Sequence, residues 1–198
     1  NLIDHPRVWC SPHIGASTYE AQEAIGKEVV QQVIKAIDSG ICDSPVNLPK
    51  SSGSNQELIK LYSLLAEKLG SCIAQLLSFN PVQIEVFYRG DLVDASHEFI
   101  RLGLMKGYLT YIKDKYVSYV NAEEEFVGTG LKIKEKNDAS FQSYKSALKI
   151  KVSNTTGDCI SVGGIVFDQR FIKLSLINDF YFETSPSGHM LVIENEDK

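Results

Sequence analysis

The chain has 198 residues, enough for one large domain or for one medium domain with an appended segment. Hydrophobic residues make up 43% of the sequence and charged residues 23%, so a disordered, collagen-like or disulfide-dominated chain is excluded. The formal net charge of −5 argues against nucleic acid and anionic membranes as general partners, because proteins that bind them usually carry a net positive surface.

The four cysteines stand at positions 10, 42, 72 and 159, without a CxxC pair or a metal-ligand spacing. Isolated cysteines of this kind favour a reducing compartment, so we expect a cytoplasmic protein with no bound metal. No apolar run approaches the roughly 20 residues that a membrane-spanning helix needs, and the amino terminus lacks the layout of a signal peptide. We therefore expect no membrane contact.

The amino-terminal residues predict a strand, a loop and one amphipathic helix. The strand is expected over 7–10. Ser17 opens the string Ser-Thr-Tyr-Glu, which is typical of a capping box at a helix start, and Ser39-Gly40 supplies a stop. Apolar residues recur along this helix at every fourth position, namely Ala21, Ile25, Val29, Val33 and Ile37.

Residues 47–56 read NLPKSSGSNQ, a run of turn formers without apolar periodicity, which predicts a linker. A second helix is expected from Leu58 to Leu76, with Pro81 marking its end. Alternation then predicts a strand over 82–88, Asp94 could cap a third helix, and a short helix follows Asn121.

Beyond Gly130 the pattern becomes that of strands separated by turns. Strands are expected over 131–136, 145–153, 159–167, 171–177 and 190–193. Gly163-Gly164 interrupts the alternation and predicts a β-bulge. Helices followed by strands predict an α+β fold in which helices pack on a mostly antiparallel sheet.

His13 lies in the string SPHIGAST, between the expected strand and the expected helix. A single loop histidine is more often structural than catalytic. PHIGAST followed by a Glu-Ala-Gln helix nevertheless resembles the closing motif of the D-2-hydroxyacid dehydrogenases, and the resemblance implies that His13 is the catalytic acid/base. The family also needs a glutamate, an arginine and a Gly-x-Gly-x-x-Gly loop for NAD. Since these motifs are absent, we expect no bound NAD and no catalysis by this chain alone.

The rest of the chain resembles the allosteric-substrate-binding, or intervening, domain of long D-3-phosphoglycerate dehydrogenases. The motifs are YRGDLVD, RLGLMKGYL, YVNAEEEF, KEKNDAS, GGIVFD and LSLINDFYFE. The resemblance implies a parent enzyme that oxidises 3-phospho-D-glycerate with NAD in serine synthesis. It also implies four parts: a catalytic-region remnant over 1–46, the linker over 47–56, the regulatory domain over 57–188 and one strand of an ACT domain over 189–198.

Six lysines between positions 131 and 151 are expected to project from one face of each of two expected strands: Lys132, Lys134, Lys136, Lys145, Lys149 and Lys151. Such lysines often only protect strand edges from pairing with other chains. The resemblance instead implies a second site for phosphate or a 3-phosphoglycerate-like anion at Lys136 and Lys145, with Arg101 and Lys106 as further candidates. Arg89-Gly90-Asp91 has the letters of an integrin-type tripeptide, but a turn that ends a strand is the better explanation of this string.

The carboxy-terminal residues HMLVIENEDK resemble the first strand and loop of an ACT domain. The resemblance implies that Asn195 and Asp197 belong to a serine-effector loop in a homo-oligomeric parent. A different class remains open, a stand-alone module for anion binding or subunit assembly like the related domain of iron–sulfur L-serine dehydratases. PHIGAST argues against that alternative, because it is a dehydrogenase motif.

Overall fold

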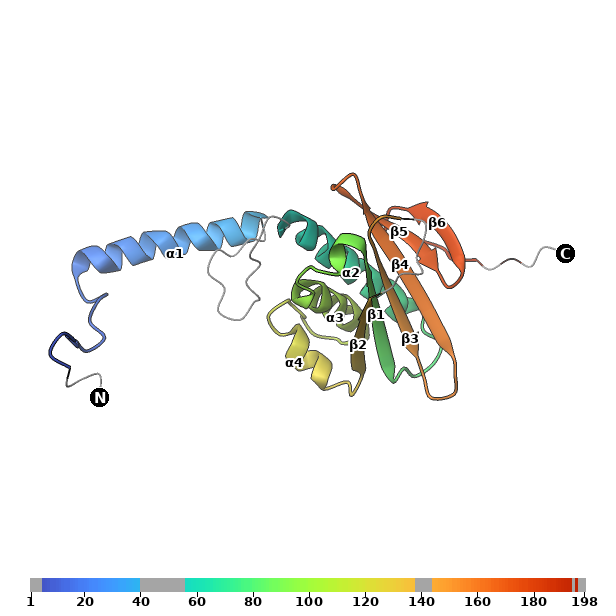
Figure 1. The fold of residues 1–198 in the computed structure, drawn as a ribbon, viewed down its shortest axis with the longest axis horizontal. Helices are drawn as coiled ribbons and strands as arrows, with labels where there is room; N and C mark the ends of the chain where they lie inside the picture. Colours follow the sequence, from blue (N-terminus) through green and yellow to red (C-terminus); the bar gives the residue numbers. More distant parts are fainter. Residues whose placement is uncertain (1–4, 40–55, 138–143, 194, 196–198) are drawn as a thin grey trace. The chain divides into compact units, whose positions relative to one another are not determined.

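Residues 1–46 and residues 47–198 form two separate compact units in the computed structural model. The structure describes residues 5–39, 56–137, 144–193 and 195. In Figure 1 the strands of the described residues belong to the second unit, and the described part of the first contains helix α1 (Tyr19–Ser39). The predicted linker therefore lies outside the described residues, except for Gln56.

α1 begins where the sequence predicts, but its cap is shifted by one residue. The Thr18 hydroxyl, rather than that of Ser17, accepts a hydrogen bond from the Ala21 amide at 3.2 Å. This follows from a first helical residue at Tyr19, which makes residue 18 the N-cap. The predicted strand over 7–10 is wrong: these residues form a loop, and no strand lies beside them in the described part of the unit.

The apolar stripe of α1 is exposed within its unit. Val29 and Val33 are each about half exposed, at 52% and 51%, and Ile37 is exposed at 77%. A soluble helix normally buries such a stripe against a core. Residues 5–39 contain no second element that could cover it.

A six-stranded sheet with the order β2-β1-β3-β4-β5-β6 forms one layer of the second unit. Its strands are β1 (Gln83–Arg89), β2 (Lys132–Asn137), β3 (Ala147–Ser153), β4 (Cys159–Phe167), β5 (Phe171–Ile177) and β6 (Phe180–Thr184). β1 pairs with β2 in parallel, and the other neighbouring strands pair antiparallel. The predicted mostly antiparallel α+β fold is confirmed.

Helices α2 (Gln56–Leu76) and α3 (Glu98–Ile112) form the other layer and cover one face of the sheet (Figure 1). The alternation predicted for β1 is confirmed, because Ile84, Val86 and Tyr88 are fully buried on that face. Leu65 of α2 packs against Gly164 of β4. A Cβ added at Gly164 would lie 2.7 Å from Cδ1 of Leu65. The core therefore lies between the two helices and one face of the sheet.

The two helices cross at glycines. A Cβ added at Gly107 of α3 would lie 1.9 Å from the Glu67 carbonyl oxygen, and one at Gly103 would lie 2.3 Å from that of Ser63. Gly70 of α2 faces the Leu104 carbonyl oxygen in the same way, at 2.5 Å. The backbones approach so closely because no side chain stands between them at these points.

Several local predictions have definite outcomes. The β-bulge at Gly163-Gly164 is confirmed by a register shift between these residues. Asp94 does not cap the third helix, because α3 begins four residues later, after the N-cap His97. β6 was not predicted. The predicted strand over 190–193 is wrong, since these residues are exposed loop with no neighbouring strand in the described structure.

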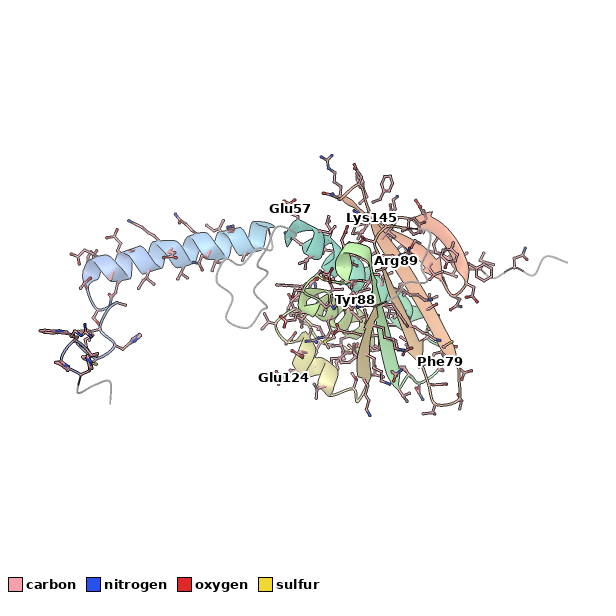
Figure 2. The ribbon with its side chains drawn as sticks, viewed as in Figure 1. Glu57, Phe79, Tyr88, Arg89, Glu124 and Lys145 are labelled. Atoms are coloured by element: carbon pink, nitrogen blue, oxygen red, sulfur yellow. The ribbon has the colours of Figure 1, made fainter. Side chains whose placement is uncertain are left out.

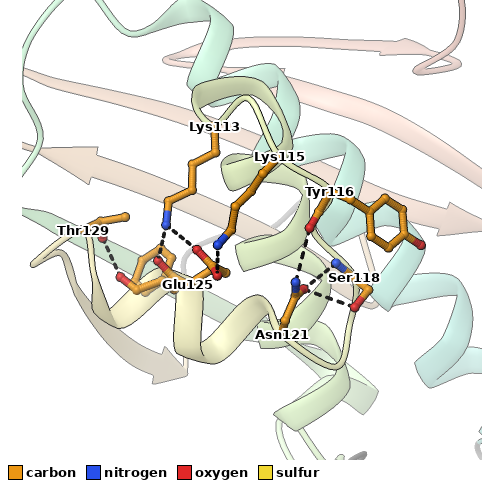
Figure 3. Close-up of polar contacts among 8 residues, drawn as sticks. Lys113, Lys115, Tyr116, Ser118, Asn121, Glu125 and Thr129 are labelled. Atoms are coloured by element: carbon orange, nitrogen blue, oxygen red, sulfur yellow. Dashed lines mark hydrogen bonds and ion pairs between the residues drawn. The ribbon is translucent and has the colours of Figure 1, made fainter.

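The short helix α4 (Ala122–Val127), predicted after Asn121, is held to the end of α3 by Glu125 (Figure 3). Lys113 Nζ donates to a Glu125 carboxylate oxygen at 2.7 Å, and Lys115 forms a second ion pair with the same carboxylate. The hydrogen bond from Lys113, followed by that from Lys115, lowers the pKa of Glu125. Asn121 organises the preceding turn by accepting from the Ser118 amide at 2.7 Å.

The Glu125 clamp predicts a pH dependence of stability. A carboxyl group whose pKa is lowered by folding stabilises the native state above its ordinary pKa of 4.5, and this contribution is lost as the pH falls through the lowered value. We expect Glu125→Gln to lose stability at pH 7 and to show a weaker further loss on acidification than the wild type. Urea denaturation at several pH values measures this. Glu124→Gln, an exposed neighbour on α4, should match the wild type, and an unchanged acid slope in Glu125→Gln would contradict the clamp.

Candidate functional site

Five lysines of β2 and β3 lie on the face of the sheet that the helices do not cover. Register places Lys134 and Lys151 on either side of Glu85, and Lys136 and Lys149 on either side of Phe87. Since alternate residues of a strand point to opposite faces, these side chains project away from the core. We call this surface the lysine face; its residues are Lys132, Lys134 and Lys136 of β2, Glu85 and Phe87 of β1, and Lys149 and Lys151 of β3.

Two lysines of the lysine face lie over the ring of Phe87. The Nζ atoms of Lys136 and Lys149 lie 5.6 and 5.9 Å from the centroid of its ring. Both distances fall within the range of cation–π attraction, which holds the two ammonium groups over one ring. Lys136 also forms an ion pair with Glu85, whose side chain is only 14% exposed. An anion binding here would therefore compete with Glu85 for Lys136.

The position of each strand separates two explanations for these lysines. β2 is at the edge of the sheet, where lysines protect against pairing with another chain, as the simpler explanation requires. β3 lies inside the sheet between β1 and β4, so edge protection cannot explain Lys149 and Lys151. Both of these lysines are partly buried. The lysines of β3 therefore need an explanation other than the protection of a sheet edge.

Arg89 extends the lysine face at the end of β1, and sequence reasoning missed it. It follows Phe87 by two residues and so projects from the same face. Its Nη1 atom is buried and has no hydrogen-bond partner in the described structure. Buried donors are rarely left without an acceptor, so an oxyanion is a suitable partner. The strand alternation could have identified this residue, but it was interpreted only as part of a turn.

Lys145 lies near Arg89 but does not belong to the strand (Figure 2). β3 begins at Ala147, so the prediction that Lys145 belongs to that strand is wrong. Its side chain is 87% exposed, and its Nζ lies 3.6 Å from an Asp91 carboxylate oxygen. The adjacent Ser146 hydroxyl accepts from the Asp91 amide at 3.0 Å. Lys149, rather than Lys145, accompanies Lys136 over Phe87.

Arg101 and Lys106 belong to α3 and do not lie on the lysine face. Lys106 Nζ lies 2.8 Å from a Glu67 carboxylate oxygen and 4.8 Å from the centroid of the Tyr119 ring, so it links α3 to α2. Arg101 Nη2 lies 3.4 Å from a Glu123 carboxylate oxygen and lines a cavity that also includes Glu135. Glu135 and Lys136 are successive residues of β2 and project to opposite faces. The structure therefore does not bring these two candidates to Lys136.

The remaining predicted site residues are exposed or lie outside the described residues. His13 is an exposed loop residue, and no carboxylate contacts its imidazole among residues 5–39. Asn195 is exposed, and Asp197 lies outside the described residues. No group of three His, Cys, Asp or Glu side chains in the described part of the chain could hold a metal ion. None of the described helices has the length and apolar character of a membrane span.

Comparison with known families gives a match over most of the sheet-and-helix unit. The model of the D-3-phosphoglycerate dehydrogenase intervening domain matches residues 58–178, from the start of α2 to the turn after β5. The chain belongs to this family. The resemblance seen in the sequence motifs is thereby confirmed, and the lysine face belongs to an intervening domain.

Curated relatives extend the similarity over both units. The chain is 30% identical to D-3-phosphoglycerate dehydrogenase of Bacillus subtilis over 99% of its length, and 28% identical to that of Methanocaldococcus jannaschii over 100%. It is 30% identical to D-3-phosphoglycerate dehydrogenase 2, chloroplastic, of Arabidopsis thaliana, again over 100%. These alignments cover 37%, 37% and 34% of the respective relatives, so the chain spans about a third of their length.

Proposed function

We propose that this chain is the regulatory part of a phosphoglycerate dehydrogenase, together with the last portion of its catalytic region. The parent enzyme would oxidise 3-phospho-D-glycerate to 3-phosphooxypyruvate with NAD, the first step of serine synthesis. The family match and the name shared by the relatives support this proposal. The isolated cysteines are consistent with a cytoplasmic enzyme.

His13 is the residue through which the chain would take part in catalysis. Oxidation of an alcohol to a carbonyl requires a base for the hydroxyl proton, and imidazole titrates near working pH. His13 would supply that base, while NAD and the other catalytic residues would bind outside this chain. The 198 residues alone would therefore be inactive. Asn195 and Asp197 would belong to a serine-effector loop in a homo-oligomeric parent.

The intervening domain itself would bind a phosphate-bearing anion on the lysine face. The observation that carries this proposal is the convergence of Lys136 and Lys149 over Phe87. Two ammonium groups held over one ring can share a phosphate, and the unpartnered Nη1 of Arg89 offers a further donor at the same end of β1. Lys145 would act from the rim, because its side chain is almost fully exposed. Binding of this anion would regulate the parent if two conformations differ in their affinity for it.

Titration of the full chain with 3-phosphoglycerate and with inorganic phosphate, followed by calorimetry and thermal melting, tests the anion site. We expect Lys136→Ala/Lys149→Ala to weaken binding by at least about tenfold, since charge-assisted hydrogen bonds contribute most among polar contacts. Glu85→Gln should strengthen binding several-fold, because it removes the carboxylate that competes for Lys136. A purely structural role of the lysines would not produce this second effect.

Lys68→Ala provides the matched control, because Lys68 is an exposed lysine of α2, the helix that covers the opposite face. It removes one positive charge, as each of the two substitutions in the double variant does, and should bind like the wild type. If neither anion binds the wild type, or if the double variant binds as tightly as Lys68→Ala, the proposed site is rejected. Equal weakening by all lysine substitutions would show a general charge effect instead of a site.

A further inference from the structure

A cavity of about 270 Å³ lies between α3, α4 and β2, on the helix side of the sheet. Its walls come from Arg101 and Met105 of α3, Glu123 and Phe126 of α4, and Leu131, Ile133 and Glu135 at β2. Liquid water occupies about 30 Å³ per molecule, so the cavity has room for a compact organic molecule. The lining combines four apolar side chains with one guanidinium and two carboxylates.

The guanidinium of Arg101 has one long contact to an acceptor and one buried donor without a partner in the described structure. Its Nη2 reaches a Glu123 carboxylate oxygen only at 3.4 Å, near the limit for a hydrogen bond, and its Nε is buried without a partner in the described structure. Of the five N–H donors of arginine, the one on Nε is buried here without an acceptor. A carboxylate in the cavity would provide acceptors in the planar arrangement that arginine binds best.

Glu135 is held in place on the other side of the cavity. The Tyr88 hydroxyl donates to one Glu135 carboxylate oxygen at 2.8 Å, and the Tyr88 ring stacks on His97 with centroids 3.6 Å apart. Burial, followed by the charge of Glu135, raises the pKa of Tyr88 and keeps its hydroxyl protonated. With Glu123 nearby, the carboxylates outnumber the single guanidinium, so the cavity also attracts a positive group.

We propose that the cavity between α3, α4 and β2 binds a small zwitterion with an apolar body, of the class of apolar α-amino acids. The ligand carboxylate would contact Arg101, and its ammonium group would contact Glu135 and Glu123. Its side chain would pack against the apolar wall formed by Met105, Phe126, Leu131 and Ile133. This site is on the opposite side of the sheet from the lysine face and does not depend on the anion proposed there.

Titration of the full 198-residue chain with L-leucine, followed by amide NMR shifts, tests the proposal. Two matched probes each lack one charge: 3-methylbutylammonium has no carboxylate, and 4-methylpentanoate has no ammonium. L-serine keeps both charges but lacks the apolar body. We expect L-leucine to shift amides of α3, α4 and β2, and each of the other three probes to bind at least about tenfold more weakly, since each loses one set of contacts.

Variants locate the site. Glu135→Gln preserves side-chain size, and Arg101→Gln removes the guanidinium and leaves a shorter polar side chain; each should weaken L-leucine binding at least about tenfold. Glu124→Gln removes a carboxylate of α4 that does not line the cavity and should bind like the wild type. If L-leucine at a concentration on the order of 10 mM causes no amide shifts in the wild type, the proposal is overturned. Equally tight binding of 3-methylbutylammonium, which would identify a simple cation site, or equal weakening by Glu124→Gln would also overturn it.

Discussion

Replacing Gly107 by alanine is expected to lower the free energy of unfolding by about 3 kcal/mol, because overpacking forces backbones and side chains to shift. The new Cβ would lie 1.9 Å from the Glu67 carbonyl oxygen, so α3 must move away from α2. In a free helix the same change stabilises by about 1 kcal/mol, because alanine is the better helix former. The sign of the effect therefore reports the contact between the two helices.

Urea denaturation followed by circular dichroism measures this difference. Gly128→Ala is the matched control, because Gly128 has a φ of −62° and its Cβ would meet only the Glu125 carbonyl oxygen, at 3.5 Å. This variant should stay within about 0.5 kcal/mol of the wild type, as is usual where no packing is disturbed. A Gly107→Ala protein as stable as the Gly128→Ala protein would mean that α2 and α3 do not cross at this glycine.

Leu65→Ala is expected to cost about 2–5 kcal/mol, the range for removing a fully buried leucine side chain and leaving a cavity. Leu65 is 0% exposed and joins α2 to the sheet at Gly164 of β4. Its Cδ1 and Cδ2 atoms pack so closely on the backbone at Gly164 that an added Cβ would lie 2.7 and 3.3 Å from them. The loss should therefore exceed that of any single substitution on the lysine face.

The adjacent residue offers a direct comparison. Leu64 belongs to the same helix but is 41% exposed, so Leu64→Ala should cost less than about 1 kcal/mol. Thermal and urea melting of the two variants gives the difference. Similar losses for Leu64→Ala and Leu65→Ala would show that the face of α2 directed at the sheet has been assigned wrongly.

Periodicity was sufficient to predict most of the sheet-and-helix unit. The leucine spacing of α2 and the alternation of β1 each reflect one buried face, so they are visible without knowledge of the partners. The bulge was visible for the same reason, because two glycines shift the alternation. β6 was missed because its residues are mostly exposed, and the Asn178-Asp179 turn that pairs Ile177 with Phe180 depends on a φ of 52° at Asn178.

The expected strands over 7–10 and 190–193 show why other predictions failed. Apolar sequence favours a strand, but a strand exists only when a neighbour accepts its hydrogen bonds, and none is present in the described residues. Which lysines lie together over Phe87 could not be predicted for a related reason. The sequence could not show that β1 lies between β2 and β3, and this placement selects Lys149 instead of Lys145 as the companion of Lys136.

The position of β1 between the two lysine-bearing strands has a consequence for any ligand of the lysine face. Neighbouring strands are about 4.8 Å apart, so the lysine rows of β2 and β3 stand roughly 10 Å apart only when β1 separates them. A peptide of residues 131–153 would contain all six lysines, yet it would lack Glu85, Phe87 and the spacing. The anion would thus recognise the native sheet alone, and its binding would serve as a reporter of completed folding.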